Sequence, residues 1–363
     1  VKYQQRDGWS ARDLLRKSHP EPKSQQQKDI FSWIVKGWDS IGPDAPKKET
    51  SLGVIWAFEK MKRASSVQEV ISLIQDFRLS HEMVTNEWKT KPEVWDALLP
   101  HLGLEATLRN LANMPRYGLL TQTSDATNKV IEKITNEEAL KKARVHPIKV
   151  LSALLTYKEG RGVRGSGVWT PVQKIVDALD EAFYKSFSSV EPTGKRRLLA
   201  LDVSSSMSGG EIAGVPGLTP CVGTAALAMA IARTEKDYQI VGFCHNLINL
   251  PVSPRMRLDD AIKVVQNRNF GSTDASKPML WAEERGLKFD SFEVFTDNET
   301  WSGGVHPSVA LKSYRQKTGI PAKEIACGMT ATGFTIADPN DPLCLDVVGF
   351  DTAVPELIAN FIR

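Results

Sequence analysis

Five oxygen-bearing side chains in the second half of the chain have the types and spacing of a divalent-cation site. An apolar run, residues 198–201, leads into an aspartate that is followed by two serines at alternate positions. A second apolar stretch, residues 292–296, also leads into an aspartate, and a Gly-Ser-Thr-Asp segment lies between the two. Carboxylate and hydroxyl oxygens are hard ligands that suit Mg²⁺, Mn²⁺ or Ca²⁺ rather than zinc. We expect Mg²⁺ first, and the predicted ligands are Asp202, Ser204, Ser206, Thr273 and Asp297.

The same residues also permit interpretations without a metal ion, or with catalysis. A cluster of serines and aspartates can simply cap helices. A phosphatase of the haloacid dehalogenase type needs an aspartate where Ser204 stands, and the α/β-hydrolase elbow needs glycines on both sides of its serine. No Gly-x-x-x-x-Gly-Lys-Ser/Thr loop occurs in the chain. No general base or nucleophile is placed beside the predicted ion, so a metal-dependent hydrolase or nuclease is the less favoured alternative.

Three groups of basic residues in the first half have the composition of an RNA-binding surface. In the first group Tyr3 and Trp9 lie among the basic residues, and such rings can stack on nucleic-acid bases. The second group lies within residues 141–149, and the third lies in the glycine-rich stretch 160–165. Each group taken alone is more often a solvated surface than a binding site. The predicted RNA-binding residues are Lys2, Arg6, Arg12, Arg16, His19, Lys142, Arg144, His146, Arg161 and Arg164.

Charge is distributed unevenly along the chain. Residues 1–196 carry 31 Lys and Arg against 24 Asp and Glu, whereas residues 197–363 carry 15 against 19. The net charge of +3 is therefore the balance of a basic half and an acidic half. This distribution favours an anionic partner for the first half and a cation for the second.

Two further features concern the surroundings of the protein. No apolar run approaches the length of about 20 residues that spans a bilayer, so we expect no membrane partner. The four cysteines are scattered without a Cys-x-x-Cys pair, which argues against a zinc site and favours a reducing compartment. We expect the cytoplasm, and the nucleus stays open.

The first half is predicted to be helical. Apolar residues recur with a period of 3.6 over residues 67–74, and almost no strand-like alternation appears before residue 190. Ser10 and Thr123 are expected to cap helices, and Pro171 to begin one. About ten short helices in succession favour a solenoid of HEAT or armadillo type, although an irregular bundle would show the same pattern. The predicted helices cover residues 10–18, 25–38, 52–63, 67–77, 92–99, 102–113, 125–134, 136–143, 147–158 and 171–187.

The second half alternates between strands and helices, which predicts a doubly wound, mostly parallel α/β sheet. The segment Glu191-Pro192-Thr193-Gly194 is the predicted boundary, so the domains are expected at 1–190 and 191–363. The predicted strands cover 197–202, 239–243, 292–296, 323–327 and 345–348. The predicted helices cover 221–233, 258–266, 275–284, 307–318 and 354–362.

The metal-site positions, in their order along the chain, resemble the metal-ion-dependent adhesion site of von Willebrand factor A domains. The whole chain resembles one family, the Ro (SS-A) autoantigen, in which a TROVE module of helical repeats precedes such a domain. The matching segments are KYQQRDGWS at residues 2–10, RVHP at 144–147, EPTGKR at 191–196, FTDNET at 295–300, GVHP at 304–307 and GFTIADP at 333–339.

This resemblance implies a function that the residue pattern alone does not. It implies a ring of HEAT-like repeats that binds small noncoding Y RNA on its outer surface and takes 3′ ends of misfolded noncoding RNA into a basic central hole. The implied role is RNA quality control within a ribonucleoprotein, with Lys2, Arg6 and His19 on the Y-RNA-binding surface. The alternative is a metal-dependent protein-interaction module that binds an acidic partner through the A domain.

Two departures from the family pattern accompany the resemblance. Family members carry further helical sequence before the position of Val1, so we expect an N-terminally truncated TROVE module whose ring need not close. Ser272 stands where the family has a second glycine before the threonine. This change lies beside a predicted ligand but leaves Thr273 in place.

Overall fold

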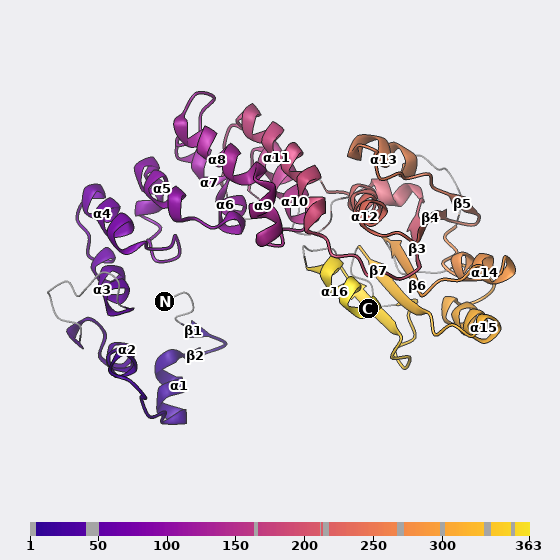
Figure 1. The fold of residues 1–363 in the computed structure, drawn as a ribbon, viewed down its shortest axis with the longest axis horizontal. Coiled ribbons are helices and arrows are strands. Elements are labelled where there is room, and N and C mark those ends of the chain that lie inside the picture. The colour runs from indigo at the N-terminus through magenta and orange to yellow at the C-terminus, as the bar shows by residue number, and fades with distance from the viewer. Residues whose placement is uncertain are drawn as a thin grey trace. The chain divides into compact units, whose positions relative to one another are not determined.

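The fold consists of a helical part followed by a sheet with helices on both faces (Figure 1). The structure is a computed structural model that describes residues 5–40, 51–162, 166–210, 212, 218–266, 272–297, 302–329, 335–349 and 353–363. The chain divides into two compact units, Val1–Ile131 and Glu132–Arg363.

The first unit opens with a β-hairpin that the sequence analysis did not predict. Strands β1 (Gln5–Arg6) and β2 (Trp9–Ser10) pair antiparallel. The turn residues Asp7 and Gly8 both have positive φ, 50° and 80°, as a tight two-residue hairpin turn requires. The expectation of a first half without strands is therefore wrong here, because strands of two residues are too short to show alternation.

Short helices form the rest of the first unit, as predicted. In α4 the apolar residues Val70, Leu73, Ile74 and Phe77 are buried on one face, and α4 packs against both α3 and α5. The helices are α1 (Ala11–Ser18), α2 (Gln25–Lys36), α3 (Ser51–Met61), α4 (Val67–Phe77), α5 (Pro92–Leu98), α6 (Leu104–Asn110), α7 (Asn113–Arg116) and α8 (Asp125–Thr135), which crosses into the second unit. Within the described residues, no helix is long and apolar enough for a bilayer.

The observed helix starts agree only in part with those predicted from the sequence. Ser10 is the N-cap of α1 and forms a capping box with Asp13, as expected. The prediction for Thr123 is wrong, because the Oγ of Ser124 accepts the N–H of Thr127 at 3.3 Å at the start of α8. Pro171 also fails to begin a helix, since α11 starts at Gln173.

The second unit contains three more helices of the basic half together with the sheet. These are α9 (Glu137–Lys142), α10 (Pro147–Glu159) and α11 (Gln173–Lys185), followed by the 3₁₀ turn η4 (Ser186–Ser189). Of these, α10 and η4 pack on the first helix of the α/β part, α12 (Pro220–Thr234). There the Arg233 guanidinium lies over the rings of Tyr184 and Phe187. The domain boundary at residues 190 and 191 stays a prediction.

The sheet of the second unit is mixed, with strand order β5-β4-β3-β6-β7-β8. All neighbours are parallel except β5, which pairs antiparallel with β4. The strands are β3 (Arg197–Asp202), β4 (Tyr238–Phe243), β5 (Leu247–Asn249), β6 (Ser291–Thr296), β7 (Lys323–Gly328) and β8 (Cys344–Val348). The predicted α/β fold is confirmed. Because chain order reverses on either side of β3, the carboxyl end of β3 is the place where such sheets bind ligands.

Helices cover both faces of this sheet (Figure 1). On one face α14 (Lys277–Glu284) and α15 (Pro307–Thr318) pack against Leu198, Ala200 and Phe292. Strand β3 is fully buried because helices cover both of its faces. This explains why its apolar run is uninterrupted. The remaining helices are α13 (Leu258–Val265) and α16 (Val354–Ile362).

Candidate metal centre and RNA-binding surface

The predicted metal ligands begin where β3 ends. Asp202 is the last residue of the strand and its side chain is buried, at 1% exposure. Its Oδ1 accepts the backbone N–H of Ser204 at 2.8 Å, which turns the chain away from the strand. Ser204 directly precedes the 3₁₀ turn Ser205–Ser208, and its hydroxyl lies 2.9 Å from that of the exposed Ser206. The Asp-x-Ser-x-Ser segment thus presents three oxygen-bearing groups at the edge of the sheet where the parallel strands have their carboxyl ends.

The adjacent strand β6 brings the second aspartate to the same edge. The hydroxyl of Thr296, the last residue of β6, donates to Asp202 Oδ2 at 2.7 Å, and Asp297 follows directly. Burial raises the pKa of Asp202 above its ordinary value, and the nearby Asp297 carboxylate adds to this rise. Hydrogen bonds from Ser204 and Thr296 act in the opposite direction. Sequence reasoning missed Thr296, although its place immediately before Asp297 was a usable signal.

The loop that carries Thr273 is held at the end of β4. The N–H of Asp274 donates to the carbonyl of Cys244, one residue beyond β4, at 3.0 Å. The carbonyl of Thr273 accepts both the N–H and the hydroxyl of Ser302, at 3.1 and 2.9 Å. Because β4 is the neighbour of β3, all five predicted ligands belong to one edge of the sheet.

The chemistry of this edge fits a divalent cation. The groups that contact the buried Asp202 carboxylate are hydroxyls and an N–H, and its charged neighbour Asp297 is also negative. A cation would offset the cost of burying the Asp202 carboxylate close to that of Asp297. Among the described residues no three His, Cys, Asp or Glu side chains gather around a possible ion. A cation held here would therefore depend on the serine and threonine oxygens.

The first predicted basic group lies on α1 and its flanks. Arg12, Arg16 and His19 are all exposed, and Trp9 beside them is 59% exposed. Arg12 and Arg16 are four residues apart, so they project from one face of the helix. His19 ends the helix in a left-handed conformation with φ 42°. Lys2 and the side chain of Arg6 lie outside the described residues.

The second basic group lies at the junction of α9 and α10. Lys142 and Arg144 are exposed, and Arg144 has a positive φ of 50°. His146 is the N-cap of α10, and its Nδ1 accepts the N–H of Ile148 at 3.2 Å. Burial, together with the charge of Lys149, lowers the pKa of His146 to about 4. His146 is therefore neutral at physiological pH and can contact RNA as a hydrogen-bonding group, without a positive charge.

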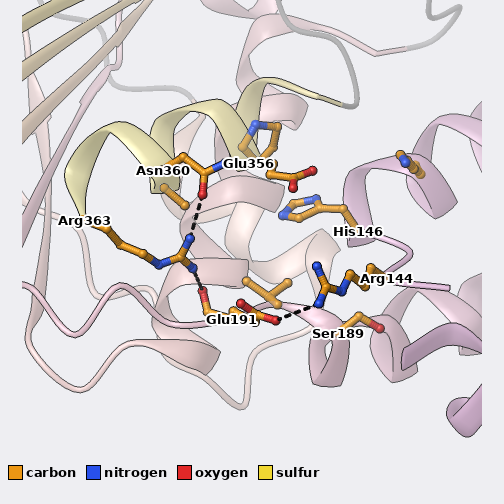
Figure 2. Close-up of a pocket in the computed structure, with 11 residues that line it drawn as sticks. Arg144, His146, Ser189, Glu191, Glu356, Asn360 and Arg363 are labelled. Carbon is orange, nitrogen blue, oxygen red and sulfur yellow. Dashed lines mark hydrogen bonds and ion pairs between the residues drawn. The ribbon is translucent and has the colours of Figure 1, made fainter. Parts of the chain in front are cut away.

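The third basic group is described only in part. Arg161 is exposed, and its Nε lies 2.9 Å from a carboxylate oxygen of Glu159, which offsets part of its charge. Arg164 lies outside the described residues. The structure brings Arg144 and His146 together on the rim of one pocket (Figure 2), while Arg161 does not line that pocket.

Comparison with known proteins agrees with this architecture. The model for the Ro60 vWA domain matches residues 196–362, and the model for the TROVE domain matches residues 1–156. RNA-binding protein RO60 of Deinococcus radiodurans is 44% identical over 366 residues, which cover 100% of this chain and 67% of that protein. The chain belongs to the Ro60 family of RNA-binding proteins.

Two further comparisons support the Ro60 assignment. RNA-binding protein RO60 of Caenorhabditis elegans is 35% identical over 403 residues, covering 100% of this chain and 62% of that relative. The crystal structure of the Deinococcus radiodurans RO (RSR) protein superposes with a TM-score of 0.91 at 44% identity, covering 100% of this chain and 72% of that one. This Ro60-family chain thus spans about two thirds of the length of its curated relatives. The predicted family and its A domain are confirmed.

Proposed function

We propose that the chain is a noncatalytic RNA-binding protein that binds small noncoding Y RNAs and the 3′ ends of misfolded noncoding RNAs. It would act in RNA quality control in the cytoplasm, as part of a ribonucleoprotein. Membership of a family of RNA-binding proteins carries this proposal. The exposed Arg12 and Arg16 on α1, with the exposed His19 directly after the helix, support it, because arginines that can reach phosphates contribute strongly to RNA affinity.

Filter binding with a Y RNA and with a misfolded RNA that has a single-stranded 3′ tail tests this proposal. We expect the double variant Arg12→Ala and Arg16→Ala to bind Y RNA roughly 10-fold more weakly, with a smaller dependence on salt, because two phosphate contacts are removed. Alanine keeps α1 helical. Arg285→Ala, at an exposed arginine beside Trp281 in the A domain, is the control. Equal Y-RNA affinity of the double variant and the control would contradict the assignment of α1.

A second candidate function is a metal-dependent interaction with an acidic partner. The buried Asp202 beside Asp297, with the solvent-facing hydroxyls of Ser204 and Ser206, favours it. These residues and Thr273 would hold Mg²⁺, or Mn²⁺ or Ca²⁺ in its place, and the bound ion would accept a carboxylate of the partner. Fluorescence polarisation with an acidic peptide tests this function. We expect binding that disappears in EDTA and in Asp202→Ala but survives ribonuclease, and binding that persists in Asp202→Ala would exclude the site.

A further inference from the structure

A pocket of about 170 Å³ lies within the second unit, where the helices of the basic half meet the last helix of the A domain. Its walls come from the start of α10, the end of η4 with the segment that follows it, and one face of α16 (Figure 2). The opposite face of α16 is buried through Val354, Ile358 and Ile362, which fixes the orientation of the helix. The pocket therefore joins groups that are far apart in the sequence.

Three cationic side chains line this pocket: Arg144, Lys149 and Arg363. The Arg363 guanidinium donates to the backbone carbonyl of Glu191 at 3.0 Å and to the Oδ1 of Asn360 at 2.9 Å. Both of these acceptors are neutral, so they position the guanidinium without cancelling its charge. Arg144 lies 4.0 Å from the Glu191 carboxylate, and both side chains are largely exposed, at 80% and 70%. A loose, exposed ion pair of this kind contributes little and can exchange partners.

Two neutral polar residues, His146 and Ser189, complete the polar lining. Nδ1 of His146 accepts an N–H, so the neutral imidazole carries its proton on Nε2 and can donate from there. The Oγ of Ser189 is buried and has no hydrogen-bond partner within the described residues. Because this hydroxyl is closed to solvent, His146 is the donor that the pocket offers directly.

The charge balance of the pocket is modest but positive. Glu191 and Glu356 line it together with the three cations, and His146 is neutral. The start of α10, a helix of 13 residues, adds a partial positive charge from its dipole. The donors therefore outnumber the carboxylates, and they come from three separate elements.

We propose that this pocket binds a phosphate of the RNA backbone, so that the A domain contributes directly to RNA binding through Arg363. The inference rests on the proposed RNA-binding function and adds a contact from α16, outside the basic half of the chain. Phosphate oxygens match the guanidinium groups of Arg144 and Arg363, and they also accept from an imidazole N–H.

Fluorescence anisotropy with a labelled single-stranded RNA, titrated against the full chain at several salt concentrations, tests the pocket. We expect Arg144→Gln and Arg363→Gln each to lower affinity by roughly 3- to 10-fold and to reduce the salt slope by about 0.7, the value for one lost phosphate contact. Arg363→Lys keeps the charge and should keep most of the affinity. Glu356→Gln removes a negative charge from the wall and should strengthen binding.

A double-mutant cycle shows whether the two arginines hold the same group. If Arg144 and Arg363 contact one phosphate, the combined variant loses less affinity than the product of the two single losses. Arg285→Gln, at an exposed arginine outside the pocket, is the matched control. Thermal melting of each variant establishes that it is folded.

The possible outcomes separate this inference from the proposed function. If the wild type binds RNA and both glutamine variants match it in affinity and salt slope, the pocket inference is wrong while RNA binding stands. If the wild type fails to bind RNA, the proposed function fails and the inference falls with it. A loss confined to Arg144→Gln, with Arg363→Gln unchanged, would also overturn the contribution of the A domain.

Discussion

His146 illustrates how position changes the chemistry of a single residue. In the sequence it belongs to a basic group and suggests a cation for RNA. In the structure it caps α10 with Nδ1 and is buried enough that its pKa falls to about 4. Its neighbour Lys149 acts in the same direction, because a nearby positive charge disfavours protonation. The residue therefore supplies a fixed, neutral donor.

This pKa predicts a pH dependence of stability. The unfolded state takes up a proton at His146 near pH 6.5, whereas the folded state does so only near pH 4. The contribution of neutral His146 to the unfolding free energy is therefore complete above pH 6.5 and is lost as the pH falls toward 4. His146→Asn keeps an N-cap acceptor but does not titrate. We expect the wild type to lose more unfolding free energy than this variant between pH 6.5 and pH 4, as measured by urea denaturation.

A matched substitution separates the effect of burial from the effect of the cap itself. His306 caps α15 in the same way, through Nδ1 and the N–H of Ser308 at 3.2 Å. His306→Asn makes the same substitution at the same kind of N-cap and is therefore the control for the cap. An equal change at both positions would attribute the effect to the cap, and not to the surroundings of His146.

At the scale of elements, β3 is fixed at both ends by polar contacts. At its start the buried Arg197 donates to Glu293 of β6 at 2.7 and 2.6 Å and to Glu235, after α12, at 3.0 Å. Glu235 also accepts the N–H groups of Thr193 and Gly194. This network ties the segment before β3 to the sheet, so that the register of β3 places Asp202 at the opposite edge.

Removing the cation from this network should destabilise the chain strongly. Arg197→Met leaves two buried carboxylates without their partner, and such a loss typically costs about 3–5 kcal/mol. Arg197→Lys keeps the charge but cannot form the paired contact with Glu293. Its unfolding free energy should therefore lie between those of the wild type and Arg197→Met. The midpoint of urea denaturation measures both variants. A change below about 1 kcal/mol for Arg197→Met would show that the network contributes little.

The sequence was most informative where an element is buried on both faces. The runs before Asp202 and Asp297 predicted β3 and β6 because parallel strands covered by helices are apolar throughout. The hairpin at residues 5–10 was not predicted because its strands are too short for a periodic pattern, although its Asp-Gly turn was present. Choosing Ser124 over Thr123 as a cap depends on one residue of helix register, which periodicity does not resolve.

The candidate sites also differ in how far the sequence predicts them. Asp202, Ser204, Ser206, Thr273 and Asp297 could be predicted together because strand ends in such a sheet share one edge. The pocket beside Arg144 could not, since Arg363 meets Glu191 across 172 positions of sequence. That contact depends on how α16 packs, and no local pattern encodes it.

For the whole molecule, the candidate ion site and the predicted phosphate contacts share no residue, which predicts that ion binding and RNA binding are independent. An ion that binds only the folded state stabilises it by about 2.7 kcal/mol at 100 times its dissociation constant. Mg²⁺ should therefore raise the melting temperature of the wild type but not of Asp202→Ala, at ionic strength matched with NaCl. RNA affinity at that ionic strength should be equal in the two proteins, because the predicted phosphate contacts lie on α1, on α16 and beside α10. Weaker RNA binding by a folded Asp202→Ala would instead couple the A-domain edge to the RNA surface.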